Sequence, residues 1–234
     1  MYRTETWSWI VALGVTWAVI AVAFSVVWLQ RSRPADFWVW PFQAAATSAG
    51  LFGLALRGVI PEEASILVGN GLVALGAALA LVGVRSLLLD APLRLGRLVP
   101  ALLGLEAYLA VFTWVVPSVP TRVLGVTAFV GMVASVALLD LTTQPWERLS
   151  SLARWVIGVF AVLVALLALR AVMLVFTLPA DPFEPGAHHR WLFAALLSLS
   201  LAGAAGLVLL TGAPSSGGAR DAGAPDGDAP SAAH

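Results

Sequence analysis

Residues 155–178 read WVIGVFAVLVALLALRAVMLVFTL, a run in which Arg170 is the only charged residue. An α-helix rises ~1.5 Å per residue, so it needs about 20 apolar residues to cross a hydrocarbon core of about 30 Å. A run of this length therefore predicts a membrane-spanning helix. Apolar runs of similar length recur along the chain, separated by prolines and charged residues.

These runs predict seven membrane-spanning helices. The expected helices cover residues 7–29, 37–56, 63–84, 98–116, 123–143, 155–178 and 191–211. Prolines mark several ends: Pro61 precedes the third helix, Pro117 follows the fourth and Pro145 follows the fifth. We therefore expect an all-α fold, a seven-transmembrane-helix bundle over residues 1–211. Residues 212–234 are rich in Gly, Ala, Pro and Ser and are expected to form a disordered cytoplasmic tail.

The composition agrees with a membrane protein. Hydrophobic residues make up 60% of the chain, charged residues only 11%, and the mean hydropathy is +0.91, so the polar residues are too few to cover a water-exposed surface. The formal net charge is zero, which argues against binding to nucleic acid. All 13 basic residues are arginine, which excludes a retinal Schiff base on lysine. The lack of cysteine excludes disulfides and thiolate metal sites.

The arginines predict how the bundle is oriented. One side, made of the loops after the first, third and fifth helices and the C-terminal tail, holds Arg31, Arg33, Arg85, Arg94, Arg97, Arg148, Arg154 and Arg220. The other side holds Arg3, Arg57, Arg122 and Arg190. By the positive-inside rule, the N-terminus lies outside and the C-terminus lies in the cytoplasm. We expect a multi-pass membrane protein in contact with the lipid bilayer.

Small residues and tryptophans predict how the helices pack and where they end. Small residues four positions apart, such as Ala46 with Gly50 and Gly76 with Ala80, allow two helices to approach closely. Most of the ten tryptophans lie near an expected helix end, where the ring is favoured at the membrane interface. Neither pattern indicates chemistry.

The residues needed for catalysis or metal binding are missing from the expected spans. The histidines are His188, His189 and His234, so a Ser-His-Asp triad is implausible. The adjacent pair His188 and His189 lacks the spacing of zinc ligands, and an exposed polar loop is the better interpretation. We therefore expect no enzymatic activity, no metal and no cofactor.

Polar residues inside the expected spans are the candidates for a functional site, because they are costly in lipid. By the helical rise, Arg170 lies about 12 Å and Glu106 about 16 Å below the outer ends of their helices. The two side chains can pair if their helices face each other, and Asn70 and Tyr108 lie at similar depth. Two interpretations remain open: an ion pair that only fixes helix register, or a pocket for a small ligand or proton reached from the outer face.

Residues 55–70, ALRGVIPEEASILVGN, carry a resemblance to a known family. The Arg-Gly turn, the Ile-Pro pair, the Ser-Ile pair and the asparagine resemble the seven-helix membrane sensor segment of bacterial GGDEF-type diguanylate cyclases. The resemblance implies a multi-pass signal-input module of the bacterial inner membrane, with Arg57, Pro61 and Asn70 as characteristic positions. No Gly-Gly-Asp-Glu-Phe signature occurs in this sequence, so cyclase activity is not implied.

The same residues also have a purely structural interpretation. Arg57 would pair with Glu62 or Glu63 across a tight outer turn, Pro61 would start a helix, and Asn70 would bond a backbone group. Three functions remain open: a sensor that passes its state to a cytoplasmic signalling enzyme or membrane-complex partner, a small transporter or permease subunit, and a structural subunit. Transport would need a continuous polar path, and polar residues thin out below Glu106.

Overall fold

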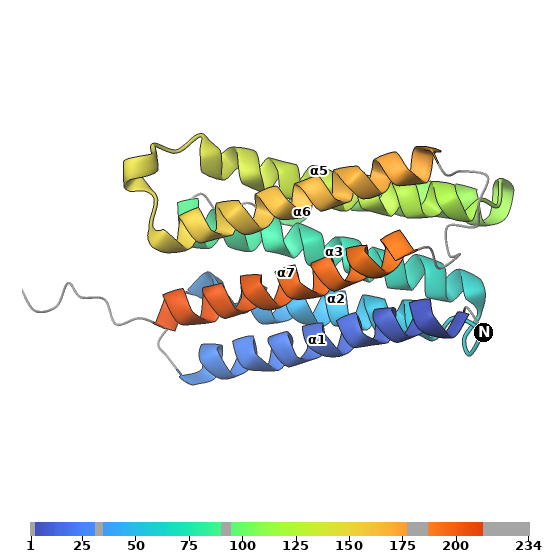
Figure 1. The fold of residues 1–234 in the computed structure, drawn as a ribbon, viewed down its shortest axis with the longest axis horizontal. Helices are drawn as coiled ribbons and strands as arrows, with labels where there is room; N and C mark the ends of the chain where they lie inside the picture. Colours follow the sequence, from blue (N-terminus) through green and yellow to red (C-terminus); the bar gives the residue numbers. More distant parts are fainter. Residues whose placement is uncertain (1–2, 31–34, 90–94, 177–186, 213–234) are drawn as a thin grey trace, which may run out of the picture.

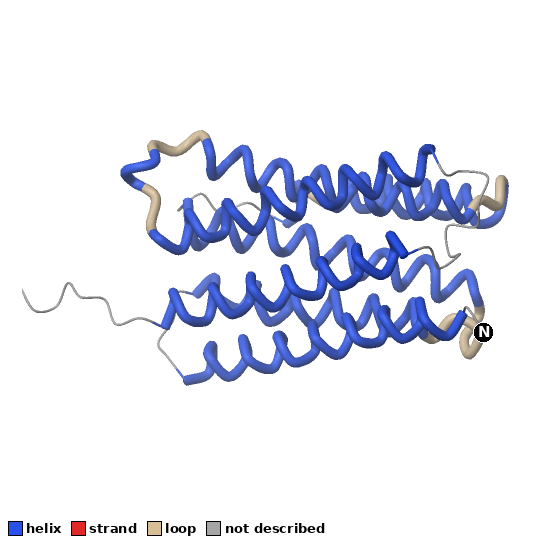
Figure 2. Tube along the Cα trace, in the orientation of Figure 1, coloured by secondary structure: helices blue, strands red, loops and turns tan. Residues whose placement is uncertain are grey.

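The computed structural model describes residues 3–30, 35–89, 95–176 and 187–212 (Figure 1). The α-helices in these ranges are α1 (Arg3–Gln30), α2 (Val39–Ala55), α3 (Glu62–Leu89), α4 (Val99–Ala110), α5 (Val119–Thr142), α6 (Ser151–Phe176) and α7 (Ala187–Gly212). The shorter elements are the 3-10 turns η1 (Ala35–Trp38), η2 (Leu95–Arg97) and η4 (Trp146–Arg148), and the π-helical turn η3 (Val111–Val115) that continues α4. Helix dominates the described chain, in which no strand is formed (Figure 2), so the predicted all-α fold is confirmed.

Each of the seven expected helices corresponds to one observed helix, and the differences lie at the ends. The helix α1 begins at Arg3, and α3 continues to Leu89. The helix α1 thus includes the charged Arg3 and Glu5, and α3 includes Arg85 and the apolar residues 87–89 beyond it. The start of α7 at Ala187 places the backbone of His188 and His189 in a helix rather than in the expected loop. The expected tail, apart from Gly212 at the end of α7, lies outside the described residues.

Four of the helices are long and apolar enough to cross a membrane. Their spans are Trp7–Leu29, Glu62–Leu89, Val119–Thr142 and Ser151–Phe176, and shorter apolar stretches cover Val99–Val115 and Trp191–Gly206. The outward faces carry large apolar side chains, such as Val22 at 63% and Phe176 at 81% exposure. Apolar patches of this kind face lipid or a partner rather than water.

Six helices form a closed ring, and α4 lies outside it. Around the ring each helix packs on the next, in the order α1, α2, α3, α5, α6, α7 and back to α1. The helix α4 packs on the outside of α3 and α5. The start of α1 and the end of α7 lie at opposite ends of the bundle (Figure 1). We call the end at which α1 begins the N-terminal end.

Glycines and serines hold α1, α2 and α3 close together. A Cβ added at Gly50 of α2 would lie 2.6 Å from the carbonyl oxygen of Gly69 in α3, so only glycine permits this approach. The Ser65 hydroxyl donates to the Gly53 carbonyl at 2.7 Å, and the Ser48 hydroxyl donates to the Gly14 carbonyl at 2.9 Å. The predicted close approach at Gly50 is therefore confirmed, and interhelical hydrogen bonds reinforce it.

An ion pair and an aromatic cluster stabilise the opposite end of the bundle. Arg85 of α3 donates to Asp140 of α5 at 2.5 Å, and both side chains are about one quarter exposed, at 28% and 24%. Phe24 packs edge-on against Phe37 and Trp40, with ring centroids 6.4 and 6.2 Å away. These contacts join side chains of α1, η1, α2, α3 and α5 at this end.

Candidate functional site: a cavity inside the helix ring

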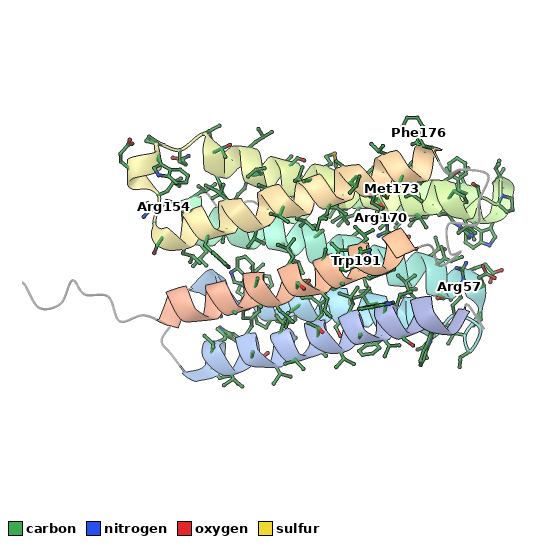
Figure 3. All side chains as sticks on the ribbon, in the orientation of Figure 1. Arg57, Arg154, Arg170, Met173, Phe176 and Trp191 are labelled. Carbon is green, nitrogen blue, oxygen red and sulfur yellow. The ribbon has the colours of Figure 1, made fainter. Side chains whose placement is uncertain are left out.

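A cavity of about 1210 Å³ lies inside the ring. Its lining comes from α1, α2, α3, α5, α6 and α7 and from the α2–α3 turn, and no residue of α4 takes part. Figure 3 draws the described side chains on these helices. Pockets for small ligands usually measure about 300–1,000 Å³, so this cavity has room for a larger one.

The charged residues that line the cavity gather at its N-terminal end. Within the described chain they are Arg57, Glu62, Arg122 and Arg170. Arg57 and Arg170 lie toward this end in Figure 3, while Arg154 marks the opposite end. From Arg170 the cavity continues along α6 to Trp155, fifteen residues or about 22 Å away by the helical rise. The charged residues of the described lining therefore lie at one end of the cavity. We call the other end, lined by Phe24, Trp40 and Trp155, the aromatic end, and Trp7 and Phe193 line the charged end.

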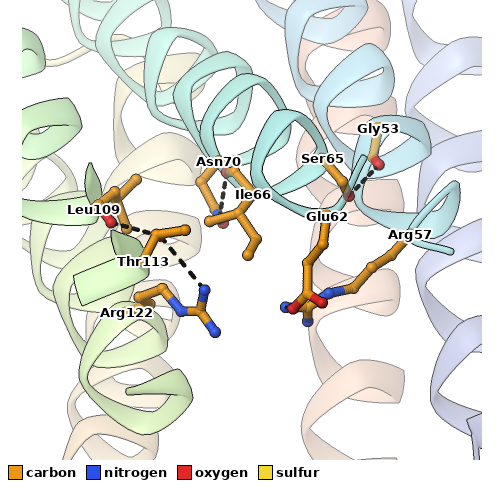
Figure 4. Close-up of polar contacts among 9 residues, drawn as sticks. All are labelled: Gly53, Arg57, Glu62, Ser65, Ile66, Asn70, Leu109, Thr113 and Arg122. Carbon is orange, nitrogen blue, oxygen red and sulfur yellow. Dashed lines mark hydrogen bonds and ion pairs between the residues drawn. The ribbon is translucent and has the colours of Figure 1, made fainter. Parts of the chain in front are cut away.

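The α2–α3 turn forms one wall of the charged end. Gly58 has a φ of +95°, a left-handed conformation that glycine adopts without strain, and the Val59 N–H donates to the Leu56 carbonyl at 2.9 Å. The turn brings Arg57 into an ion pair with Glu62, the first residue of α3 (Figure 4). Pro61 directly precedes that helix, as is typical of a helix start. The structural interpretation of this turn is confirmed.

Arg122, in the first turn of α5, forms the facing wall. Its side chain is only 8% exposed, and it donates to the Thr113 hydroxyl at a long distance of 3.4 Å. Thr113 sits in the π-helical turn and donates to the Leu109 carbonyl at 2.6 Å. The charged groups that act on the Arg122 guanidinium are Arg57 and Glu62, which face it across the charged end (Figure 4).

The importance of Arg122 was not predicted from the sequence. The expected fifth helix begins at residue 123, which leaves Arg122 in a loop. The observed α5 begins at Val119, with Pro120 in its first turn. A proline in the first turn is a helix-start signal, and applying it here would have placed Arg122 inside the bundle.

Two of the predicted site residues, Asn70 and Arg170, line the cavity. The Asn70 side-chain amide donates to the Ile66 carbonyl at 2.8 Å, so part of its hydrogen-bonding capacity is used within α3. Arg170 lies about 9 Å inside the end of α6 by the helical rise. No ion pair to Arg170 is formed by any residue that the structure describes.

The other two predicted site residues, Glu106 and Tyr108, lie on α4, outside the ring. The Glu106 carboxylate lies against Gly71 of α3. The Tyr108 hydroxyl donates to the Thr121 carbonyl at 2.9 Å, and its ring contacts Phe112 with centroids 4.7 Å apart. Both residues therefore contribute to the packing of α4 on the ring.

The predicted pair between Glu106 and Arg170 is wrong. The helix α4 packs on α3 and α5, whereas α6 packs on α5 and α7. Matching depth along two helices is not sufficient for contact, because the helices must also be neighbours. The observed ion pairs among the described residues are Arg57–Glu62 and Arg85–Asp140.

Neither a metal site nor a similarity to known proteins adds a further assignment. Among the described residues, no three His, Asp or Glu side chains gather to hold a metal ion. No family model, curated protein or solved structure matches the chain. The cavity and its charged end are therefore the features from which a function can be inferred.

Proposed function

We propose that this chain is an integral membrane signal-input module, a sensor that binds a small ligand inside the helix ring. It has no catalytic output of its own and passes its state to a separate partner. The observation that carries the proposal is a large, partly open cavity that is lined by six helices and charged at one end. A ligand that binds one arrangement of the ring better than another shifts the population of the two.

The proposed orientation places the charged end at the outer face of a bacterial inner membrane. The arginine distribution supports a cytoplasmic location for the opposite end. Four helices of sufficient length and the apolar outer faces support insertion into lipid. A ligand would then enter from outside the cell, between the α2–α3 turn and the start of α5.

The resemblance to the sensor segment of diguanylate cyclases supports a signalling role. The residues that carry it, 55–70, include the turn and the ion pair at the charged end of the cavity. A cytoplasmic signalling enzyme or another membrane-complex subunit would be the partner. The resemblance and the cavity thus point to the same part of the chain.

The ring offers a route from the charged end to the cytoplasmic end. One half, α1–α2–α3, is held by close glycine contacts and interhelical hydrogen bonds, and α5 packs with α6 in the other half. The two halves meet where α3 packs on α5 and where α7 packs on α1, and Arg85 and Asp140 join α3 to α5 at the cytoplasmic end. A ligand held between Arg122 of α5 and Arg57 of the α2–α3 turn would therefore shift the packing of α5 against α3.

The same geometry favours a sensor over a transporter. A transporter needs polar groups along the path of its substrate. Here no charged residue of the described lining lies beyond Arg170 toward the aromatic end, which is lined by Phe24, Trp40 and Trp155. Neither Arg85 nor Asp140 lines the cavity. The cavity is thus built for binding from one side.

Pulsed electron paramagnetic resonance tests whether the ring responds to a ligand. The native chain lacks cysteine, so Leu29→Cys and Gln144→Cys introduce spin labels only at the cytoplasmic ends of α1 and α5. We expect the distance between the labels to shift when inorganic phosphate, octanoate or palmitate is added to the protein in nanodiscs. The control pair Leu29→Cys and Trp38→Cys lies within one half and should not shift.

A flux assay on the same probes separates the three functions. We expect proteoliposomes that contain the chain to show no uptake of a probe that shifts the label distance. Uptake coupled to the shift would instead identify a transporter. A distance that stays constant with every probe, without uptake, would identify a structural subunit.

A further inference from the structure

We infer that the cavity binds an anionic amphiphile with a single acyl chain, its head group held by Arg122 and Arg170 and its chain lying along the cavity toward Trp40 and Trp155. This inference rests on the proposed function, because it names the ligand class of the same cavity. It follows from three features: the charge at one end, the apolar wall and the length.

The excess positive charge at the N-terminal end of the cavity favours an anionic ligand. Three arginines and one glutamate line the described cavity, and Glu62 is already paired with Arg57. Arg122 is more than nine-tenths buried, and its one hydrogen bond goes to a neutral hydroxyl. A guanidinium has five N–H donors arranged to bind a carboxylate or phosphate through two hydrogen bonds. A buried cation without such a partner is unfavourable, so a bound anion would stabilise it.

Most of the wall beyond the arginines is apolar. The uncharged polar side chains on the described wall, apart from tryptophan, are those of Gln43, Thr47, Asn70, Thr127 and Ser200. Valines of α5 line it as a stripe, and Leu163, Phe160 and Val159 of α6 continue it. The hydroxyls of Thr47 and Ser200 donate to carbonyl oxygens of their own helices, those of Gln43 and Leu196. The protons of these two hydroxyls are therefore already used within their own helices and are not available to a ligand. At the far end, the buried Nε1 of Trp40 lies beside Gly83 of α3.

The length of the cavity selects an extended ligand. The part between Arg170 and Trp155 spans about 22 Å by the helical rise, most of a hydrocarbon core of about 30 Å. A small anion such as phosphate would occupy only the charged end and leave the apolar part empty. A long-chain fatty acid or a one-chain lysophospholipid would fill both parts, with the carboxylate or phosphate at the arginines.

Photoaffinity labelling tests the ligand class directly. The full chain in nanodiscs of zwitterionic lipid is incubated with palmitate that carries a diazirine at its terminal carbon, then illuminated and mapped by mass spectrometry. We expect adducts at the aromatic end, on Trp40, Trp155 or Phe24. Adducts confined to outward-facing residues such as Val162 and Leu169 would overturn the inference, because they report probe dissolved in the lipid.

Competition identifies the head group. Unlabelled palmitate and lysophosphatidylglycerol are each added in excess. Loss of the adducts at a lower mole fraction of palmitate indicates a carboxylate head group, and loss at a lower mole fraction of lysophosphatidylglycerol indicates a phosphate. Palmityl alcohol has the same chain without the charge and should compete at least tenfold less well. Octanoate has the charge without the length and should leave the adducts in place. Equal competition by palmityl alcohol would overturn the role of the arginines.

Two variants and one control test the head-group site and the acyl-chain path separately. We expect Arg122→Gln to reduce labelling at the aromatic end about tenfold or more, and Arg154→Gln, at the opposite end of α6 and outside the cavity, to leave it unchanged. Ala77→Phe narrows the cavity while all arginines remain, and it should also abolish labelling at the aromatic end. If Arg122→Gln fails to fold, Ala77→Phe still tests the inference. Full labelling of the Ala77→Phe variant would contradict an acyl chain lying along the cavity.

The two proposals can fail independently. Adducts at the aromatic end without any shift in the spin-label distance would leave the ligand class standing and remove the sensing role. A distance shift with inorganic phosphate, without adducts from the palmitate probe, would leave the sensor standing and remove the amphiphile.

Discussion

Arg85 and Asp140 show how this bundle accommodates charge at the scale of single residues. The pair joins α3 to α5, and both side chains are only about one quarter exposed, at 28% and 24%. Breaking a pair in such a setting leaves one charge without its partner, which costs more than the pair itself contributes. Arg122 is the contrasting case, because its one hydrogen bond in the described chain goes to a hydroxyl. We therefore assign a structural role to the first arginine and a binding role to the second.

A charge-swap experiment checks the structural role. We expect Asp140→Asn to lower the free energy of unfolding by about 1–2 kcal/mol, between the values for exposed and buried pairs. The double variant Arg85→Asp with Asp140→Arg should recover part of that loss. Unfolding in mixed micelles, followed by circular dichroism, provides the measurement. The two residues do not stabilise each other if the stability lost in the double variant equals the sum of the losses in Arg85→Asp alone and Asp140→Arg alone.

The sequence predicted how far along its helix each polar residue lies, but not toward which neighbouring helix its side chain points. Residue number and helical rise correctly place Asn70 and Arg170 near the charged end of the cavity. The direction of a side chain around its helix depends on which helices are neighbours, and α4 packs outside the ring. Glu106 and Tyr108 were for this reason expected beside Asn70 and Arg170, whereas they lie on α4 and do not line the cavity, and the place of Arg122 on the cavity wall was overlooked.

At the scale of helices, the contact between α2 and α3 depends on glycine. A Cβ at Gly50 would lie 2.6 Å from the Gly69 carbonyl oxygen and 2.8 Å from the Val73 backbone nitrogen. Backbone atoms cannot move aside as a flexible side chain can, so the helices would have to separate. In contrast, no atom lies within 4 Å of a Cβ added at Gly158 of α6.

A matched pair of glycine variants tests this contact. We expect Gly50→Ala to destabilise the protein by about 1–3 kcal/mol through overpacking. The control Gly158→Ala should be neutral or stabilising by about 0.5–1 kcal/mol, because alanine is the better helix former and the site has space. Thermal unfolding of both variants in the same detergent gives the comparison. Equal melting temperatures for the two variants would contradict the close contact.

The helices were predictable because their signal is local. Apolar runs bounded by proline and charge determine where each helix lies to within a few residues, and small residues four apart predicted the approach at Gly50. The π-helical turn at the end of α4 has no comparable local signal. The order of helices around the ring also depends on contacts between distant parts of the chain, which no local pattern encodes.

At the scale of the whole molecule, the ring creates a cavity with two different ends. Three arginines lie at the N-terminal end, aromatic side chains lie at the other, and the outer faces of the helices are apolar. This asymmetry supports binding from one side of a membrane and a response at the other. It also gives α5 two distinct faces, one toward the cavity and one exposed on the outside of the ring.

Cysteine reactivity along α5 in intact cells tests this account most directly. The cavity-facing positions are Val119, Val123, Val126, Val130 and Val133, and the outward-facing controls are Ala128 and Met132. Each is replaced by cysteine in a chain that has none of its own, and a membrane-impermeant thiol reagent is added outside cells washed with albumin to remove fatty acids. We predict that the cavity-facing positions react, with rates that fall from Val119 to Val133 and that palmitate reduces, while the controls do not react. Equal rates on both faces of α5, or reaction only after the cytoplasmic side is exposed, would contradict a cavity open to the outer face.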